Sequence, residues 1–287
     1  MKAILASLAG LPGDHAVLKV SAQIAKAHGA HVDALHVYMG PRTVQAAIGG
    51  YSSMTEDKLM EMSSVLVREE NGRRNRAHAV FDEVCLRQGL ASLAAPRPGG
   101  GASTSFVDVD SLAMAETARR ARNYELTVMA REARLLPSRI TMVLTESGRP
   151  LMLAPPNPRE SVGSNIAIAW KPSPEAARAL TAASPFLARA TKVTLLVVPE
   201  GDDMQSDAIA SARLLQETLA WRGLQVNVLA TNASDDVGPA LREAAYGLEA
   251  DLLVMGAYGH SRFREFVLGG STRSLLQNCD IPLLLAH

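Results

Sequence analysis

The sequence is poor in aromatic residues and nearly lacks cysteine, and each shortage excludes a class of protein. Only 4% of its 287 residues are aromatic, so a core drawn from 47% hydrophobic residues is mainly aliphatic. The two cysteines, Cys85 and Cys279, lie far apart and cannot form the dense disulfide framework of a small secreted protein. We expect packed free thiols in a reducing compartment, and hence a cytoplasmic protein.

Charge of a single sign and long apolar runs are also absent. The 29 basic and 29 acidic residues give a formal net charge of zero, so we expect no nucleic-acid partner and no anionic membrane partner. No apolar run approaches the roughly 20 residues that span a bilayer. The start of the chain, Met1–Leu8, resembles a short signal peptide, but its apolar pattern is repeated at Ile166–Lys171. We therefore predict that Ala3–Leu8 is a first strand.

An internal repeat defines the organisation of the chain. Three further pairs of apolar, strand-like segments correspond: His31–Val37 and Lys192–Val198, Glu125–Met129 and Asp251–Met255, Pro150–Ala154 and Pro282–Ala286. Helical patterns alternate with these strands, which predicts βαβ units and a parallel sheet covered on both faces. We predict two α/β domains, at residues 1–155 and 165–287, joined by a proline-containing linker at 156–164.

Between the first-copy strands lies a longer helical region than in the second copy. Apolar spacing predicts a helix at Asp57–Val67, and Ala77–Leu86 continues an amphipathic helix after the charged stretch Arg68–Arg74. The preceding segment, Gly40–Ser53, is interpreted as a mobile cover for a cleft. In the second copy the pattern predicts a helix at Ala208–Trp221.

A glycine-rich segment directly follows the predicted strand Asp251–Met255. Its characteristic residues are Gly256, Gly259, Gly269, Gly270, Ser271 and Thr272. Glycines let the backbone approach a ligand closely, and successive N–H groups beside hydroxyls at a helix start suit phosphate oxygens. The pattern is neither a Walker loop nor a GxGxxG fingerprint. It predicts a distinct phosphate-binding loop.

The first copy lacks this loop. Ala130–Ala133 stands where the second copy has Gly256–Gly259, and the stretch before the next strand is shorter. Side chains replace glycines and several N–H donors are lost, at about 0.5–1.5 kcal/mol each. We interpret the first copy as a degenerate, structural partner.

The spacing of the glycines closely resembles the nucleotide-binding signature of the universal stress protein family. The intervening His260–Leu268 and the closing Pro282–Leu285 are similar to that family as well. The resemblance implies a tandem two-domain member with two Rossmann-like modules (adenine nucleotide α-hydrolase-like), each a five-stranded, mainly parallel sheet flanked by helices. It also implies that ATP or a related adenine nucleotide, with or without Mg²⁺, binds in a cytoplasmic stress-response protein that is regulatory rather than catalytic.

The resemblance, with the rule that ligands lie at the carboxyl ends of parallel strands, suggests a set of nucleotide-binding residues. They are Ala169, Trp170, Lys171, Val197, Met255, Gly256, Gly259, His260, Arg262, Gly269, Gly270, Ser271 and Thr272. Nucleotide-binding members usually carry an acidic residue where this chain has Lys171. A lysine cannot accept a hydrogen bond, so Lys171 either contacts a phosphate or is a surface residue. His260 and Arg262 likewise either contact phosphates or point into solvent.

Two other functions stay open. Lys171 and the degenerate first copy favour a scaffold that binds no nucleotide. A slow ATPase is a weaker alternative, because no general base, pair of metal-binding carboxylates or nucleophile accompanies the loop. We expect no metal site, since His31 and His36 face opposite sides of their strand.

The resemblance also implies that the last strands of the two modules pair. These strands contain Leu151–Leu153 and Leu283–Leu285, so that one chain imitates a dimer. Covering the leucine-rich strand edges favours the same pairing. Further association of two chains into a homodimer stays open.

Overall fold

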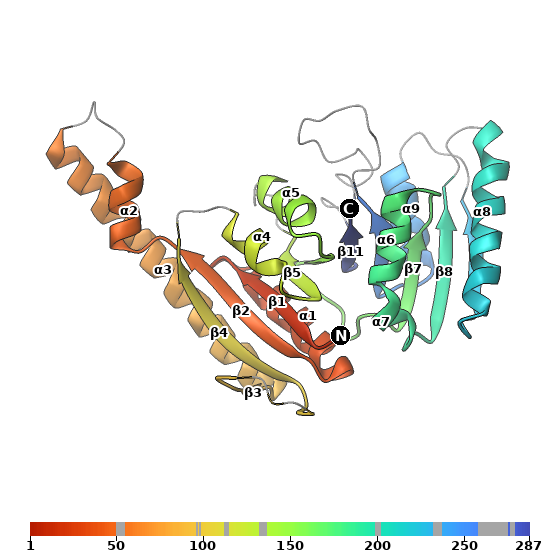
Figure 1. Cartoon of the computed structure of the whole chain (residues 1–287), viewed down its shortest axis with the longest axis horizontal. Helices are drawn as coiled ribbons and strands as arrows, with labels where there is room; N and C mark the ends of the chain where they lie inside the picture. Colours follow the sequence, from red (N-terminus) through yellow and green to blue (C-terminus); the bar gives the residue numbers. More distant parts are fainter. Residues whose placement is uncertain are drawn as a thin grey trace. The chain divides into compact units, whose positions relative to one another are not determined.

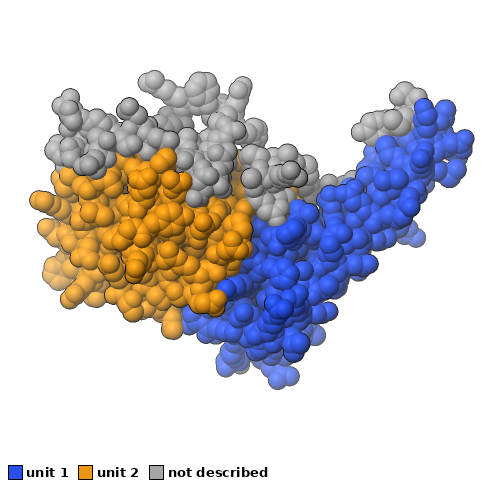
Figure 2. All heavy atoms as spheres, turned by 180° about the vertical axis from the view of Figure 1, so that it is seen from behind, with its two compact units in different colours: residues 1–130 blue, residues 131–287 orange. Residues whose placement is uncertain are grey.

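The structure is a computed structural model, and it forms two compact units, residues 1–130 and 131–287 (Figure 2). It describes residues 1–49, 55–95, 97, 99–111, 115–131, 137–198, 202–231, 237–257, 275 and 279–287. Both units are α/β, with helices packed on a mainly parallel sheet (Figure 1). None of the helices in these ranges is long and apolar enough to cross a membrane.

The first unit is a parallel sheet with the strand order β3-β4-β2-β1-β5. Its elements are β1 (Ala3–Leu8), α1 (Asp14–His28), β2 (His31–Tyr38), α2 (Pro41–Ile48), α3 (Glu56–Gln88), β3 (Ala91–Ser92), β4 (Ser103–Asp110), α4 (Glu116–Ala121) and β5 (Leu126–Ala130). The predicted first strand is confirmed as β1, which is buried from Ile4 to Leu8. Helices α1 and α3 lie behind this sheet in Figure 1, and α4 lies in front of it.

The second unit has the strand order β6-β11-β10-β7-β8-β9. Its elements are α5 (Pro137–Glu146), β6 (Leu151–Ala154), β7 (Asn165–Ala169), α6 (Pro174–Ala182), α7 (Ser184–Leu187), β8 (Lys192–Val197), α8 (Asp202–Ala220), β9 (Val226–Ala230), α9 (Val237–Gly247), β10 (Leu252–Gly256) and β11 (Leu283–Ala286). All its strand pairs are parallel except β6 with β11.

The antiparallel pair of β6 and β11 confirms the expected pairing of the last strands of the two repeats. Leu283 lies opposite Leu153, and Leu285 lies opposite Leu151, and the side chains of both strands are buried. This pairing places β6 in the second compact unit, so the division at residues 130 and 131 precedes the end of the first repeat. The domain boundary at residue 155 stays a prediction, because it marks the end of the first sequence repeat and not the end of a compact unit.

The long helix α3 contains both predicted helical stretches and the charged stretch between them. One helix runs from Glu56 to Gln88 without interruption. The charges stabilise it locally, because Arg73 donates to Glu69 at 2.6 Å across one turn. Its second half is fixed to the unit through buried Phe81 and Val84. Ion pairs and the packing of the second half therefore keep the helix continuous through its polar middle.

The segment before α3 is also more ordered than the sequence analysis expected. Pro41–Ile48 forms α2, with Pro41 in the first turn, where its missing N–H is harmless. Val44 and Ile48 of α2 are buried, and α2 packs against α3. The interpretation of Gly40–Ser53 as a mobile cover is therefore wrong for residues 41–48, and residues 50–54 lie outside the described part of the chain.

A buried carboxylate fixes the entry into the second sheet. Asp251, which is 3% exposed, accepts hydrogen bonds from the backbone N–H groups of Gly163 (3.0 Å), Ser164 (3.1 Å) and Asn165 (2.9 Å), and from Ser161 Oγ (2.7 Å). In the first repeat Glu125 does the same for the start of β1, accepting from the backbone N–H groups of Lys2 and Ala3. Each copy of the repeat thus has an acidic anchor between two strand starts.

We predict that Asp251→Ala lowers the free energy of unfolding by about 2–4 kcal/mol, because several donors around it lose a charged acceptor in a buried place. Chemical denaturation followed by circular dichroism measures the change. The matched control is Asp82→Ala, since Asp82 is exposed and has no such set of donors among the described residues, and it should change stability by less than about 0.5 kcal/mol. Equal stabilities of the two variants would contradict the role of Asp251 as an anchor.

We also predict that both thiols of the folded protein resist modification. Cys85 and Cys279 are free and buried, and burial raises the pKa of Cys85 to about 11 and also raises the pKa of Cys279. The reactive thiolate is therefore scarce near neutral pH. A colorimetric thiol reagent at pH 7.5 should react at least about 100-fold more slowly with native than with denatured protein. Rapid labelling of the native protein would show that one thiol is accessible.

Candidate functional site

The strand order of the second unit creates a switch point between β7 and β10. From β7 the chain proceeds to β8 and β9 on one side, and it then returns to β10 and β11 on the other side. Met255 of β10 pairs with Ala169 of β7, so the carboxyl ends of the two strands lie side by side. Ligands of open parallel sheets bind outside the strand ends at such a point.

The turn after β7 is held by hydrogen bonds on both sides. The Trp170 N–H donates to Leu196 O of β8 at 2.8 Å, and its indole Nε1 donates to Ser211 Oγ of α8 at 3.2 Å. Ser173 then caps α6, because its Oγ accepts from the backbone N–H of Ala176 at 3.2 Å. The side chain of Lys171 is exposed. The turn therefore orients the first turn of α6, the positive end of that helix, at the switch point.

Gly256, at the end of β10, lies directly against this first turn of α6. A Cβ atom placed on Gly256 would lie 2.6 Å from the backbone nitrogen of Ala176 and 2.8 Å from Cβ of Glu175. No side chain fits there without moving the helix or the strand. Gly256 thus has a packing role, in addition to the approach to a ligand for which the sequence analysis singled it out.

The structure brings six of the sequence-predicted site residues to this edge of the sheet. They are Ala169, Trp170, Lys171, Val197, Met255 and Gly256. The side chains of Val197 and Met255 are apolar and buried. The remaining predicted residues lie outside the described residues: Gly259, His260, Arg262, Gly269, Gly270, Ser271 and Thr272.

Arg131 is a residue of the second unit that the sequence analysis did not single out. Its guanidinium is buried and donates from Nη1 to Leu275 O at 3.1 Å and from Nη2 to Asp280 Oδ1 at 3.3 Å. Its backbone N–H also donates to Ala154 O at 2.8 Å. Arg131 belongs to the tetrapeptide that replaces the first glycines in the first copy. Arg131 therefore binds residues that follow the glycine segment of the second copy in the sequence.

The corresponding strand end in the first unit is occupied by protein. The Asp14 carboxylate is buried and accepts from the backbone N–H groups of Ala9 at 2.9 Å and Gly10 at 2.8 Å. Helix α3 passes so close that a Cβ on Gly10 would lie 2.3 Å from the carbonyl oxygen of Arg73. The amides after β1 thus already have an anionic partner, which agrees with a structural role for this unit.

A second charged cluster ties α3 to β4 in the first unit. Asp108 accepts from Arg74 Nε at 3.0 Å and from His78 Nε2 at 2.8 Å, and the His78 ring stacks on Phe106. Burial alone would raise the pKa of Asp108, but the hydrogen bonds from Arg74 and His78 outweigh it and hold the pKa below its usual value. Neighbouring His36 is buried, and burial lowers its pKa. The cluster secures the helix that covers the first strand end.

Comparison with known proteins identifies relatives of this chain. A sequence model of the universal stress protein family matches residues 164–287. A universal stress protein of Synechocystis sp. is 35% identical over 79 residues, which are 27% of this chain and 26% of that protein. The match thus spans about a quarter of the length of that curated relative.

Solved structures extend the likeness of fold to the whole chain. A universal stress protein from Archaeoglobus fulgidus matches 99% of this chain and 97% of its own, with 18% identity and a TM-score of 0.68. A candidate universal stress protein from Pseudomonas aeruginosa matches 100% of this chain and 93% of its own, with 12% identity and a TM-score of 0.58. At such identities the likeness establishes the α/β fold alone.

We predict that Gly256→Ala lowers the free energy of unfolding by about 1–3 kcal/mol, because the added methyl group must displace the first turn of α6. Denaturant unfolding of the full chain measures the loss. The control is Gly247→Ala at the end of α9, where an added Cβ meets nothing within 4 Å and alanine favours the helix. If Gly256→Ala were as stable as the control, the close approach would not constrain the fold.

Proposed function

Because residues 164–287 belong to the universal stress protein family, we propose that this chain is a cytoplasmic stress-response protein whose second unit binds ATP or a related adenine nucleotide. The observation that carries the proposal is the switch point between β7 and β10. Gly256 ends β10 at that point, and the glycine segment follows it in the sequence. The role is regulatory, with the nucleotide changing how the protein binds a partner.

In this proposal the phosphates are bound by the glycine segment. The backbone N–H groups at Gly259, Gly269 and Gly270 are the donors, joined by the hydroxyls of Ser271 and Thr272. His260 and Arg262 add charge-assisted contacts to phosphate oxygens. Mg²⁺ accompanies the nucleotide if its phosphates need further neutralisation.

The adenosine part then lies over the ends of β7 and β8. Ala169 and Trp170 border this place, and Val197 and Met255 form its floor. The Trp170 ring is fixed by its bond to Ser211, which limits the shapes that the nucleoside can adopt. Lys171 cannot accept a hydrogen bond from the base or ribose, so we expect weaker selection for adenine. We expect Lys171 to contact a phosphate instead.

A scaffold that binds no nucleotide is the second candidate. Lys171 stands where the family usually has an acid, and the first unit closes its own strand end with Asp14 and α3. Both features favour a protein that retains the fold and acts only through its surface.

Isothermal titration of the full chain, stripped of carried-over ligand, separates the two candidates. We predict micromolar affinity for ATP, measured with and without Mg²⁺, and a ranking against GTP, AMP and cyclic AMP that reports what Lys171 selects. Replacing Gly269 and Gly270 by valine should reduce affinity at least about 100-fold, because several phosphate donors are displaced.

The matched control is Gly101→Val in the first unit, where an added Cβ meets nothing within 4 Å. It should bind ATP as the unmodified chain does. If no nucleotide produces heat with the folded protein, nucleotide binding is refuted and the scaffold is the remaining function.

A further inference from the structure

The outer face of α8 exposes large apolar side chains along one line. Leu214 is 65% exposed and Trp221, two helical turns further, is 93% exposed. Ala212 and Leu219, on the opposite side of the helix, are buried. An exposed tryptophan is unusual on a free surface and is enriched at the centres of protein interfaces.

Trp221 follows the last residue of α8 but keeps helical spacing. Gly223 has a φ of 75°, its N–H donates to Ala220 O at 2.9 Å, and the N–H of Leu224 donates to Leu219 O at 3.2 Å. These two bonds form a Schellman motif, in which the glycine is the first non-helical residue after the cap. Trp221 therefore stands on the same line as Leu214.

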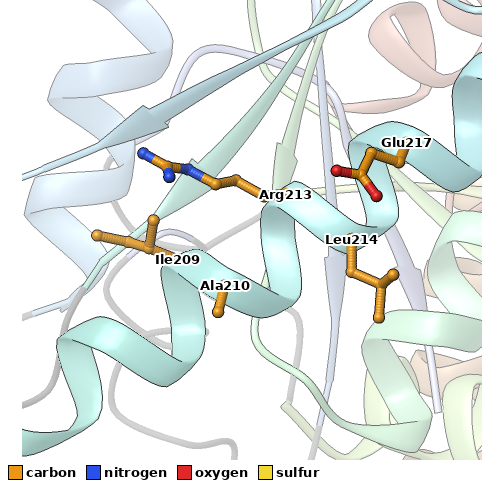
Figure 3. Close-up of a pocket in the computed structure, with 5 residues that line it drawn as sticks. All are labelled: Ile209, Ala210, Arg213, Leu214 and Glu217. Carbon is orange, nitrogen blue, oxygen red and sulfur yellow. The ribbon is translucent and has the colours of Figure 1, made fainter.

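A shallow pocket lies beside this line. Its lining residues are Ile209, Ala210, Arg213, Leu214 and Glu217 (Figure 3). Arg213 and Glu217 both project from α8 in Figure 3, and the structure records no ion pair for either within the ranges that it describes. The face thus combines apolar residues with one positive and one negative charge on the same flank.

These residues are complementary to a second copy of themselves. When two α8 helices lie antiparallel about a twofold axis at the level of Leu215, Arg213 of each faces Glu217 of the other. The small Ala210 then lies opposite the large Trp221. In an antiparallel helix pair with twofold symmetry, each side of one helix faces the same side of the other helix. Arg213 and Glu217 lie on the same side of α8, so they can face each other across the axis.

A second pair of charges follows the same symmetry. Asp207 and Arg222 are about equally distant from the level of Leu215, on the other flank of the helix. Arg222 donates to Ser184 Oγ at 3.3 Å in an exposed place, a long bond that water or a carboxylate can replace. Four charges of alternating sign fit a second copy, whereas a membrane surface or a nucleic acid requires charge of one sign.

We propose that this face of α8 is a homodimer interface, in which the α8 helices of two chains pack antiparallel. Trp221 of each chain lies over Ala210 of the other, and Arg213 pairs with Glu217 across the twofold axis. The interface is independent of nucleotide binding. One helix pair buries less than the roughly 1,200–2,000 Å² of stable interfaces, so we expect a dissociation constant on the order of 10–100 μM.

Sedimentation velocity over a range of concentrations tests this interface through charge exchange. Arg213→Glu and Glu217→Arg should each weaken dimerisation at least about 10-fold, because like charges then face each other twice. A 1:1 mixture of the two variants should restore it, since every contact between the two chains is again between opposite charges. Trp221→Ser should weaken dimerisation without rescue by either variant. Circular dichroism verifies that each variant is folded.

The matched control is Lys58→Glu, an exposed charge reversal on α3, which should leave dimerisation unchanged. A chain that stays monomeric at every concentration overturns the proposal. The exposed face of α8 would then be a binding surface for a different protein. Association that none of the α8 variants weakens, or that the mixture does not restore, also overturns it, because the dimer then uses another surface.

Discussion

The candidate site depends on the contact between the end of β10 and the first turn of α6. Parallel pairing with β7 brings Gly256 to the level of Ala169, and the capped start of α6 then lies on the same edge of the sheet. The absence of a side chain at Gly256 lets strand and helix touch backbone to backbone. The position of the strand end at the candidate site is therefore set by packing within the fold.

The two units differ in what lies at the carboxyl end of their first strand, β1 in the first unit and β7 in the second repeat. In the first unit, Asp14 accepts the hydrogen bonds of the amides after β1, and α3 presses on Gly10. In the second unit, the turn after β7 instead carries Lys171 into solvent and Trp170 toward α8. The end of β1 is closed by a carboxylate of its own unit, whereas the end of β7 lies beside the end of β10, which the glycine segment follows in the sequence. The asymmetry supports a division between a structural unit and a binding unit.

Much of the sheet could be predicted because buried parallel strands are short, uninterrupted apolar runs. The pairing of Leu151–Leu153 with Leu283–Leu285 followed from the family resemblance and from the need to cover leucine-rich edges. The full length of helix α3 could not be read from apolar spacing, because its charged middle carries no such spacing. Ion pairs such as Arg73 with Glu69, and packing of its second half, hold it together.

The sequence by itself determined which short apolar segments form strands and where the glycine segment lies along the chain, because these follow from patterns between close neighbours in the chain. The tertiary structure decided which residues meet across long separations. Arg131 binds Leu275 O, Asp251 holds the start of β7, and Gly256 touches α6. None of these contacts has a local signature, since each partner is chosen by the path of the chain and by the exclusion of water from the space between them.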